Sequence, residues 1–532
     1  MRVIRWVTFV LLIVAQSCLA QEVQGWEQLL GVHREFLELR DAGMKGNAHD
    51  FSPATVQMRA SKLRKLQSDL LAISPKTWAV PRKVDWVLVR TELNDLDFDY
   101  RVVRPWSRDA SFYLDFFATL AYVDVPLQGE KLTSLQDQLR AVPEIVHQAE
   151  QNLTEGGGDL TDIAIFHLEH YDGVGQGEPV RNPQPQGVLG WYADLLARAQ
   201  KQQPELAGDV EKALGAARHY HDWLVANRAR LNKPSAVGLE NYNWYIRNVR
   251  LMPYQADDLR TIGEVEMSRA RTFLKIEQNK NRDLPELKPA ANAEEYNARV
   301  REAEQLIRSF LVENKLVTIP DYVGPQKTDA FWIQRPNGKR HFWEEIQYRD
   351  PLVDHIHASI PGHRFDILLH QHDSRPIRAD YMDGGRIEGW GFYCEEMMLQ
   401  AGILKDRPRA RELFYIAQLA RAARIPAELK IQAGEFSLQQ AVDYMVRTVP
   451  FMDENLARYD LEIYFRRPGY GMNYVAGKLQ IEDLLAARAE QQGTNFNLGK
   501  FHDDFLAAGM IPVTLTRWEM IGPEHLQEFD LP

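Results

Sequence analysis

Apolar residues recur at helical spacing through most of this chain, and this periodicity constrains the fold more than any other feature. Leu63, Leu66 and Leu70 show the pattern, because residues three and four apart share one face of a helix. The sequence therefore predicts a mainly α, large multi-helical fold. Segments with this pattern cover residues 26–42, 54–73, 82–102, 132–153, 187–202, 208–231, 256–280, 293–314, 350–372, 385–402, 409–423, 437–448, 453–466, 472–491 and 498–508.

Two stretches depart from this periodicity. Glycine and proline cluster between about residues 155 and 187, which predicts a loop or a hinge. Residues 329–345 read DAFWIQRPNGKRHFWEE, with two aromatic-rich arms on either side of Asn337-Gly338. That dipeptide favours a type I′ turn, so we expect a small β-hairpin here, next to the motif region described below.

The first twenty residues have the features of a secretory signal. Arg2 and Arg5 precede an apolar run from Val7 to Ala15, and small residues lead up to Ala20. We expect residues 1–20 to be a cleavable signal peptide and the mature protein to be periplasmic or secreted. Cleavage would remove one of the two cysteines and leave Cys394, so no internal disulfide is expected. No other run is apolar and long enough to predict a membrane span in the mature chain.

The composition excludes several protein classes. With 45% apolar and 26% charged residues among 532, the chain is neither low-complexity nor disordered. Two cysteines exclude a disulfide scaffold and a multi-cysteine metal site, and a net charge of −11 argues against nucleic acid as a partner. We expect one large helical domain over 21–532, with an N-terminal half at about 21–250 and a motif-bearing half at about 251–532.

Histidines concentrate in one short segment of the motif-bearing half. Five of the fifteen lie within eighteen residues, at His355, His357, His363, His370 and His372. Neutral imidazole is the commonest metal ligand, and a catalytic zinc ion usually takes three protein ligands. The alternative is that these histidines are exposed or are satisfied within the core.

Helix geometry limits which of these histidines can act together. His357 and His363 are six residues apart and point roughly 120° from one another on a straight helix. Pro361 removes a hydrogen bond and clashes with the preceding turn, so a break at Pro361-Gly362 is expected and would bring His363 back towards His357. About 25 residues later, Glu388 offers a carboxylate.

Four sequence blocks resemble those of a known family, in the same order. They are His357–Asp366, Glu388–Glu395, Pro468–Gly477 and Phe501–Val513. The chain resembles the bacterial domain of unknown function eight-eight-five family, whose patterns run HExxPGHxxQ, EGWxxYxE, PGQAxxYxxGxxxI and FHxxxLxxGxxPL. That family is similar to zinc metallopeptidases of the gluzincin type. The resemblance implies that His357, His363 and Glu388 hold zinc and that Tyr474 contacts the substrate or an oxyanion.

Three residues depart from the family pattern. Ala358 replaces the glutamate that would act as general base, and losing such a base costs about 10²–10⁴-fold in rate. Asp366 and Tyr470 replace two glutamines. We hypothesise that Asp366 is a relocated catalytic base, against the alternative that it is a solvated carboxylate. Asp354, four residues before Ala358, is a weaker candidate.

Three functions are compatible with this pattern. The first is an exported zinc metallopeptidase-like hydrolase of peptide or small amide substrates. The second is a catalytically silent pseudopeptidase that binds peptides or a partner protein, because Ala358 lacks a carboxylate. The third is a different metal-assisted reaction on a small metabolite. Four arginines after the second block are spaced as on solvated helix faces: Arg407, Arg411, Arg421 and Arg424.

Overall fold

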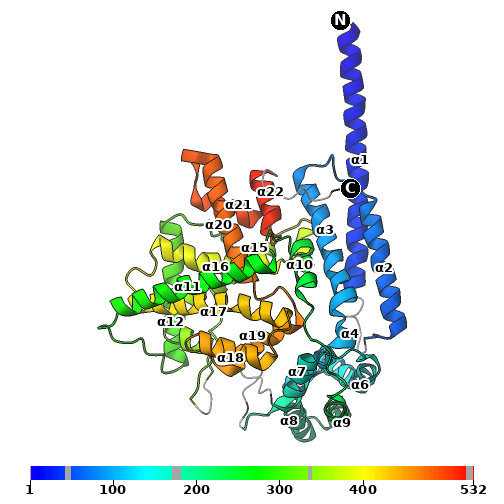
Figure 1. Ribbon diagram of the computed structural model, residues 1–532, viewed down its shortest axis with the longest axis vertical. Helices are drawn as coiled ribbons and strands as arrows, with labels where there is room; N and C mark the ends of the chain where they lie inside the picture. Colours follow the sequence, from blue (N-terminus) through cyan, green and yellow to red (C-terminus); the bar gives the residue numbers. More distant parts are fainter. Residues whose placement is uncertain are drawn as a thin grey trace.

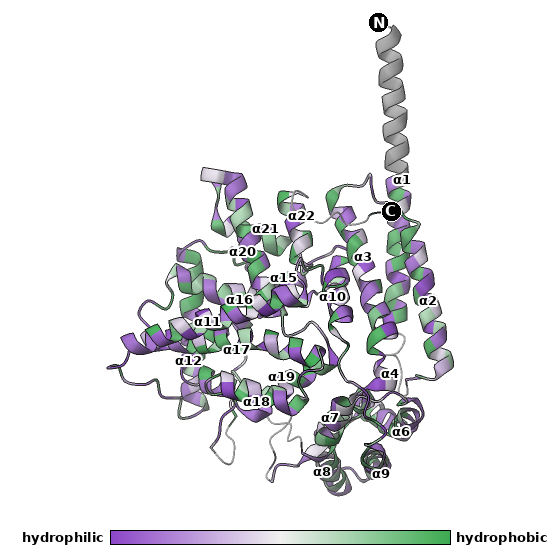
Figure 2. Cartoon of the chain, in the orientation of Figure 1, coloured by the Kyte–Doolittle hydropathy of each residue, from purple (hydrophilic) through white to green (hydrophobic). Residues whose placement is uncertain are grey.

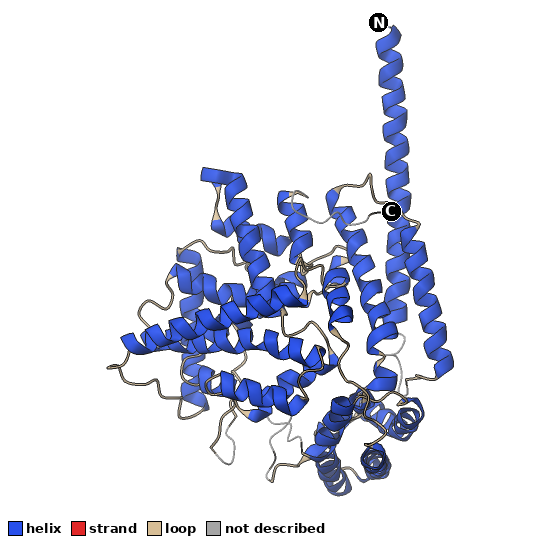
Figure 3. Cartoon of the chain, viewed as in Figure 1, coloured by secondary structure: helices blue, strands red, loops and turns tan. Residues whose placement is uncertain are grey.

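The computed structural model describes residues 2–41, 49–170, 181, 183–333, 338–522 and 531. Throughout this part of the chain the fold consists of helices and loops, without a strand (Figure 3). The predicted mainly α, multi-helical fold is therefore confirmed. Hydrophobic and hydrophilic residues alternate along the helices (Figure 2), as expected where one face of a helix is buried.

Three long helices open the chain: α1 (Arg2–Asp41), α2 (Pro53–Leu71) and α3 (Val80–Phe98). They run side by side (Figure 1), and their shared apolar cluster also contains Leu515 and Trp518 near the C-terminal end. The two ends of the sequence thus pack into one core. Residues 2–20, the predicted signal peptide, form the first part of α1, and their cleavage stays a prediction.

The next helices build a second apolar cluster below the first in Figure 1. Short elements lead into it: the π-helix η1 (Asp99–Val103), α4 (Pro105–Arg108), α5 (Ala110–Leu114) and η2 (Ala118–Tyr122). Its long helices are α6 (Gly129–Asn152), α7 (Gly158–Glu169), α8 (Gly187–Gln202) and α9 (Pro204–Asn227). Helix α7 occupies part of the stretch predicted as a loop, and residues 171–180 and 182 of that stretch lie outside the described part.

The remaining helices surround the largest apolar cluster. They are α10 (Leu239–Asn248), α11 (Ala256–Lys280), α12 (Ala293–Glu313), α13 (Phe342–Gln347), α14 (Leu352–Ala358), α15 (His363–His370), η3 (Arg378–Asp380), α16 (Gly384–Ala401), α17 (Pro408–Gln432), α18 (Leu438–Thr448), α19 (Glu454–Arg466), α20 (Asn473–Gln492), η4 (Gly493–Asn495), α21 (Leu498–Ala507) and α22 (Val513–Ile521). Helix α17 is buried on nearly all sides, with α11 alongside it (Figure 1).

The predicted β-hairpin at residues 329–345 is wrong. Residues 334–337, which include the turn residue Asn337, lie outside the described part, but the described residues of neither arm form a strand, and Phe342 begins helix α13. The backbone groups that a hairpin would pair have other partners. The Ile333 N–H donates to the Tyr348 hydroxyl at 3.0 Å, and the Phe342 N–H donates to the Asp453 carboxylate at 2.8 Å. Hydrogen bonds from the backbone to distant side chains thus replace the cross-strand hydrogen bonds of the hairpin that the Asn337-Gly338 pattern favours.

Among the described residues, no helix is both long and apolar enough to cross a lipid bilayer. This agrees with the absence of a predicted span after residue 20. Cys394, the thiol expected to remain after cleavage, is fully buried in the largest cluster, where burial raises its pKa well above the usual value. It is packed as an apolar residue, not positioned as a nucleophile.

Candidate metal centre

The predicted helix break between His357 and His363 is confirmed. Helix α14 ends at Ala358 and α15 begins at His363, so the helical segment expected over 350–372 consists of two helices. A side chain at Gly362 would place its Cβ 1.8 Å from the His357 carbonyl oxygen, so only glycine fits there. The change of direction brings the two imidazole rings to 4.5 Å between centroids.

Helix α16 lies close enough to this break to add a carboxylate to the two imidazoles. A Cβ at Gly391 would lie 2.8 Å from the His357 ring, and one at Gly389 would lie 2.5 Å from the backbone of Gly477 on α20. Both glycines therefore permit a close approach that any side chain would prevent. Glu388 projects from the same helix towards His357 and His363.

The donor atoms of these three residues are spaced as metal ligands are. Glu388 Oε2 lies 3.4 Å from His357 Nε2 and 3.2 Å from His363 Nε2, and the three ligand atoms lie within 4.8 Å of one another. Ligands about 2.0–2.2 Å from a tetrahedral zinc ion lie roughly 3.3–3.5 Å apart. Glu388 Oε2 is also buried and accepts no well-directed hydrogen bond from the described residues. The residues present thus fit a zinc ion.

A carboxylate lies behind His357 and pairs with its ring. His357 Nδ1 lies 2.7 Å from Glu395 Oε1, which leaves Nε2 to face Glu388. Arg421 in turn lies 2.9 Å from Glu395, and Gln418 donates to the same carboxylate at 3.3 Å. Metal-binding histidines commonly have such a carboxylate behind them, because it fixes the tautomer and makes the ligand more basic.

Electrostatics favour an ionised Glu388. Burial raises its pKa, but His357 and His363 together lower it well below the usual value. Burial and the charge of Arg421 lower the pKa of His357, whereas contacts with Glu388 and Glu395 more than offset this and raise it overall. A proton and a metal ion therefore compete for His357, so metal affinity is expected to fall at low pH.

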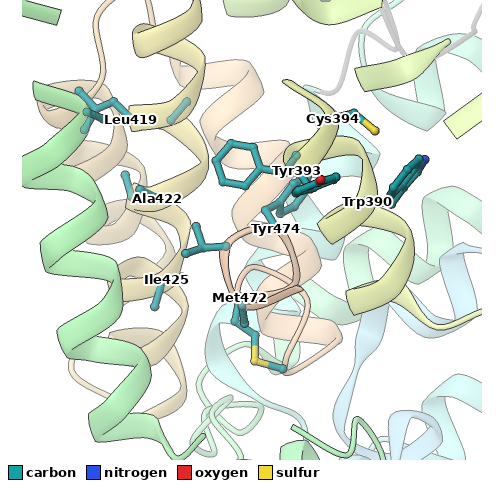
Figure 4. Close-up of a cluster of buried hydrophobic side chains, with 14 of the residues drawn as sticks. Trp390, Tyr393, Cys394, Leu419, Ala422, Ile425, Met472 and Tyr474 are labelled. Atoms are coloured by element: carbon teal, nitrogen blue, oxygen red, sulfur yellow. The ribbon is translucent and has the colours of Figure 1, made fainter. Parts of the chain in front are cut away.

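Two tyrosines from the third sequence block complete the site. The Tyr470 hydroxyl donates to Glu388 Oε1 at 3.3 Å, and the Tyr474 ring stacks on His357 with 6.2 Å between centroids. Burial raises the pKa of Tyr470 to about 12 and that of Tyr474 well above its usual value. Both phenols therefore keep their protons at neutral pH and can donate hydrogen bonds. Figure 4 shows Tyr474 between residues of α16, such as Trp390, and residues of α17, such as Leu419.

Glu428, which the sequence analysis did not single out, supports the loop that carries Tyr470. Its carboxylate accepts from the backbone N–H groups of Gly469, Tyr470 and Met472 at 2.7, 2.9 and 3.1 Å. It also accepts from the Tyr242 hydroxyl at 3.1 Å. Burial raises the pKa of Glu428 to about 7. The sequence offered one signal for Glu428: it lies seven residues after Arg421, and residues seven apart share one face of a helix, here α17.

Arg421 and Arg424 are buried, not solvated as predicted. Each is at most 5% exposed, and each lies against an acid: Arg421 against Glu395 and Arg424 against Asp460 at 2.6 Å. The Arg424 guanidinium also covers the Tyr474 ring at 4.5 Å from its centroid. Arg421 therefore fixes Glu395, which lies behind His357, and Arg424 packs on Tyr474.

Asp366 is buried and engaged elsewhere. Both of its oxygens accept from Arg386, at 2.9 and 3.2 Å, and the two side chains are at most 3% exposed. This pair ties α15 to α16. A base role for Asp366 stays a prediction, and its bidentate partner disfavours it, because taking up a proton would leave a buried guanidinium unpaired. Ala358 is exposed, with only a methyl group where a carboxylate was expected.

The other three histidines of the cluster do not join the three ligands. His355 pairs with the buried Glu304, and His372 stacks on Tyr322 at 3.9 Å between centroids. Among the described residues, the one group with metal-ligand spacing is His357, His363 and Glu388, so His370 is not part of it. His355 is thus a buried histidine that pairs with a core residue, which was the alternative to a metal ligand.

Comparisons with known proteins give a family and a fold. Among solved structures, the chain is similar to "a putative lipoprotein of unknown function" from Shewanella oneidensis, with 17% identity and a TM-score of 0.71 over 93% of this chain and 99% of that one. It is also similar to "the putative lipoprotein" from Colwellia psychrerythraea, with 15% identity and a TM-score of 0.68 over 95% and 98% of the two chains. At these identities the likeness shows the fold alone.

No curated protein matches the chain. The sequence profile of the family described as "Bacterial protein of unknown function (DUF885)" matches residues 29–520, which is most of its length. The resemblance seen in the four sequence blocks is thereby confirmed at the level of the family, and the chain belongs to the DUF885 family of bacterial proteins.

Proposed function

We propose that this protein is a zinc-dependent hydrolase of peptide or other amide bonds that acts outside the cytoplasm. The observation that carries the proposal is the convergence of His357, His363 and Glu388, whose ligand atoms lie within 4.8 Å of one another, with Glu395 behind His357. An extracytoplasmic location is supported by the signal-like residues 1–20 and by the two similar solved structures, each described as a "putative lipoprotein".

Each residue of the site would have a separate role in such a reaction. Bound zinc would polarise the substrate carbonyl and lower the pKa of a water molecule. Glu395 and Arg421 hold the His357 ring in place, and the Tyr470 hydroxyl holds Glu388. Tyr474, whose proton is retained at neutral pH, can donate to negative charge that develops on the carbonyl oxygen.

The methyl group of Ala358 favours a second candidate function, which is peptide binding without turnover. A missing general base slows hydrolysis by about 10²–10⁴-fold, so turnover is expected to be slow or absent. The three candidate ligands and Glu395 are nevertheless present. Binding without hydrolysis would therefore retain the same metal centre.

Metal content tests the site directly. We expect the purified protein to hold one equivalent of zinc, and His363→Ala to hold none, by elemental mass spectrometry. His219→Ala is the matched control, because His219 is an exposed residue of α9 that pairs with Glu150. A wild-type protein that takes up no zinc even when zinc is added would refute the metal centre.

A peptide-library digest separates the two functions. It compares the wild type with Ala358→Glu, each with and without a zinc chelator. Cleavage by the wild type that the chelator abolishes supports the hydrolase. Cleavage by the Ala358→Glu variant alone supports peptide binding without turnover. If neither protein cleaves any peptide, hydrolysis of peptide bonds is excluded.

A further inference from the structure

A small cavity opens beside Ala358, on the helix that carries His357. Its volume is about 260 Å³, and its walls come from α12, α13, α14, α15 and the loop at 326–331. A water molecule takes up about 30 Å³ in the liquid, so the space suits one side chain rather than a whole small-molecule ligand. Phe331, which is 62% exposed, lies at the cavity, and Tyr296 forms part of its wall.

Asp354 presents a carboxylate to this cavity. It lies one helical turn before Ala358, and side chains on a helix lean towards its N-terminus. A long side chain at position 358 would therefore extend over Asp354, whereas alanine leaves the carboxylate open to the cavity. The replacement of the expected glutamate by Ala358 thus removes a base and also leaves the Asp354 carboxylate uncovered.

One oxygen of Asp354 is held and the other is available. The Gln347 amide donates to Oδ2 at 2.8 Å, and Gln347 is itself oriented because its own oxygen accepts from the Tyr296 hydroxyl at 3.1 Å. In the described part of the chain, Oδ1 has no hydrogen-bond donor and Asp354 forms no ion pair. Burial raises the pKa of Asp354, whereas the charges of His357, Arg421 and His355 act in the opposite direction.

The other charged groups at the cavity are already engaged. His355 pairs with Glu304, which Arg308 also contacts at 2.7 Å. Arg364 donates to the Gly324 carbonyl at 2.8 Å. Asp354 is therefore the charge that a ligand can neutralise, and a ligand cation would stabilise its ionised form.

We propose that this cavity binds the cationic side chain of a lysine or arginine in the substrate, and that Asp354 selects it. The inference rests on the proposed function, because Asp354, His357 and Ala358 lie within five residues of α14. One turn of a helix rises about 5.4 Å, so Asp354 lies within one turn of His357, although none of the three candidate ligands lines the cavity. A substrate residue seated there would lie next to the bond that is attacked.

Binding of a matched peptide set tests this subsite. The peptides are acetylated and amidated, so they carry no terminal charges, and they differ at one position as lysine, arginine, norleucine or glutamate. Calorimetry with the full chain is expected to show about ten-fold tighter binding of the lysine and arginine peptides than of norleucine. The titration is run with and without a zinc chelator, so the preference remains measurable if zinc or hydrolysis is absent.

Two variants and a control assign the preference to this cavity. Asp354→Asn should remove the ten-fold preference, and Ala358→Leu should weaken binding of the lysine peptide by covering Asp354. Asp329→Asn should keep the preference, because Asp329 is an exposed carboxylate that pairs with Arg301 and lies outside the cavity lining. Wild-type protein without the preference, or Asp354→Asn protein that retains it, overturns the proposal. If Asp354→Asn loses turnover of every peptide but binds each peptide as the wild type does, Asp354 acts as a base. That result also overturns the proposal.

Discussion

Helices α6–α9 and helices α16–α17 are both buried, but their interiors have opposite chemistry. The described part of 129–227 buries Asn152, Thr161 and Gln203 and no charged side chain. The two helices at 384–432 bury six charged side chains: Arg386, Glu395, Glu396, Arg421, Arg424 and Glu428. The first region is an apolar core between amphipathic helices, and the second is a network of paired charges.

The difference shows where this protein tolerates the cost of buried charge. Removing a charge from water costs several kcal/mol unless a partner compensates for it. In α16–α17 each buried arginine has an acid within 3 Å, and Lys478 on α20 lies 2.7 Å from Glu396. Two of these pairs lie at the candidate site: Arg421–Glu395 beside His357, and Arg424–Asp460 beside Tyr474. Charge is thus buried where side chains must be held in one orientation, and excluded where packing alone is required.

Breaking one pair in the charged region should have the largest effect. Arg421→Met leaves Glu395 buried beside His357 without its guanidinium, and the free energy of unfolding should fall by about 3–5 kcal/mol. Urea unfolding measures this. Arg218→Met is the matched control, because Arg218 is exposed on α9 and its loss should change stability by less than about 0.5 kcal/mol. Equal losses in the two variants would contradict the comparison.

A cavity in the apolar region should cost stability without touching the metal site. Leu195 on α8 is fully buried, so Leu195→Ala should lower the free energy of unfolding by about 2–5 kcal/mol. Zinc affinity, measured by competition with a chromogenic chelator, should stay at the wild-type value. A large drop in zinc affinity would show that the two regions are coupled.

Glu428 should make stability depend on pH. Its pKa is raised by burial to about 7, whereas an unfolded glutamate titrates near about 4.3, so the folded state holds the proton more tightly. Its contribution is fully present below about pH 4.3 and is lost as the pH rises through about 7. Relative to Glu428→Gln, the wild type should lose on the order of 3 kcal/mol over this window in urea unfolding. A pH-independent difference would argue against a raised pKa.

An exposed ion pair of the apolar region should matter least. Arg228 lies 2.5 Å from Asp162, with the two side chains 32% and 53% exposed. Solvent screens such pairs, so Arg228→Met should change the free energy of unfolding by less than about 1 kcal/mol, and less still at high salt. A loss as large as that of Arg421→Met would mean that burial does not decide the value of a charge pair here.

Local periodicity was sufficient for the amphipathic helices. The expected segment 187–202 coincides with α8, and 132–153 differs from α6 by three residues at its start and one at its end. Helix α17 was expected only to residue 423, yet it continues through Pro426 to Gln432. A helix buried on nearly all sides lacks a continuous solvent-facing stripe, so no periodic signal marks where it ends.

Part of the candidate site was also predictable. Pro361 and Gly362 indicated the helix break because proline cannot continue the hydrogen-bond pattern. The approach of His357, His363 and Glu388 then agrees with the expected ligand set, although zinc itself stays a prediction. The partners of Asp366 and Arg421 could not be predicted, because a helical position shows only which face a charge occupies. Whether that face meets solvent or an opposite charge depends on another helix.

The sequence by itself determined the family, the mainly helical fold and the residues offered as metal ligands. The helical fold follows from periodicity over a few neighbouring residues, whereas the family and the expected ligands follow from the resemblance carried by the four ordered sequence blocks. Only the tertiary structure decided that the 329–345 segment forms no hairpin, that Glu428 holds the Tyr470 loop, and that Ala358 opens a cavity onto Asp354. Those outcomes depend on contacts between helices far apart in the chain, where burial and pairing override local preference.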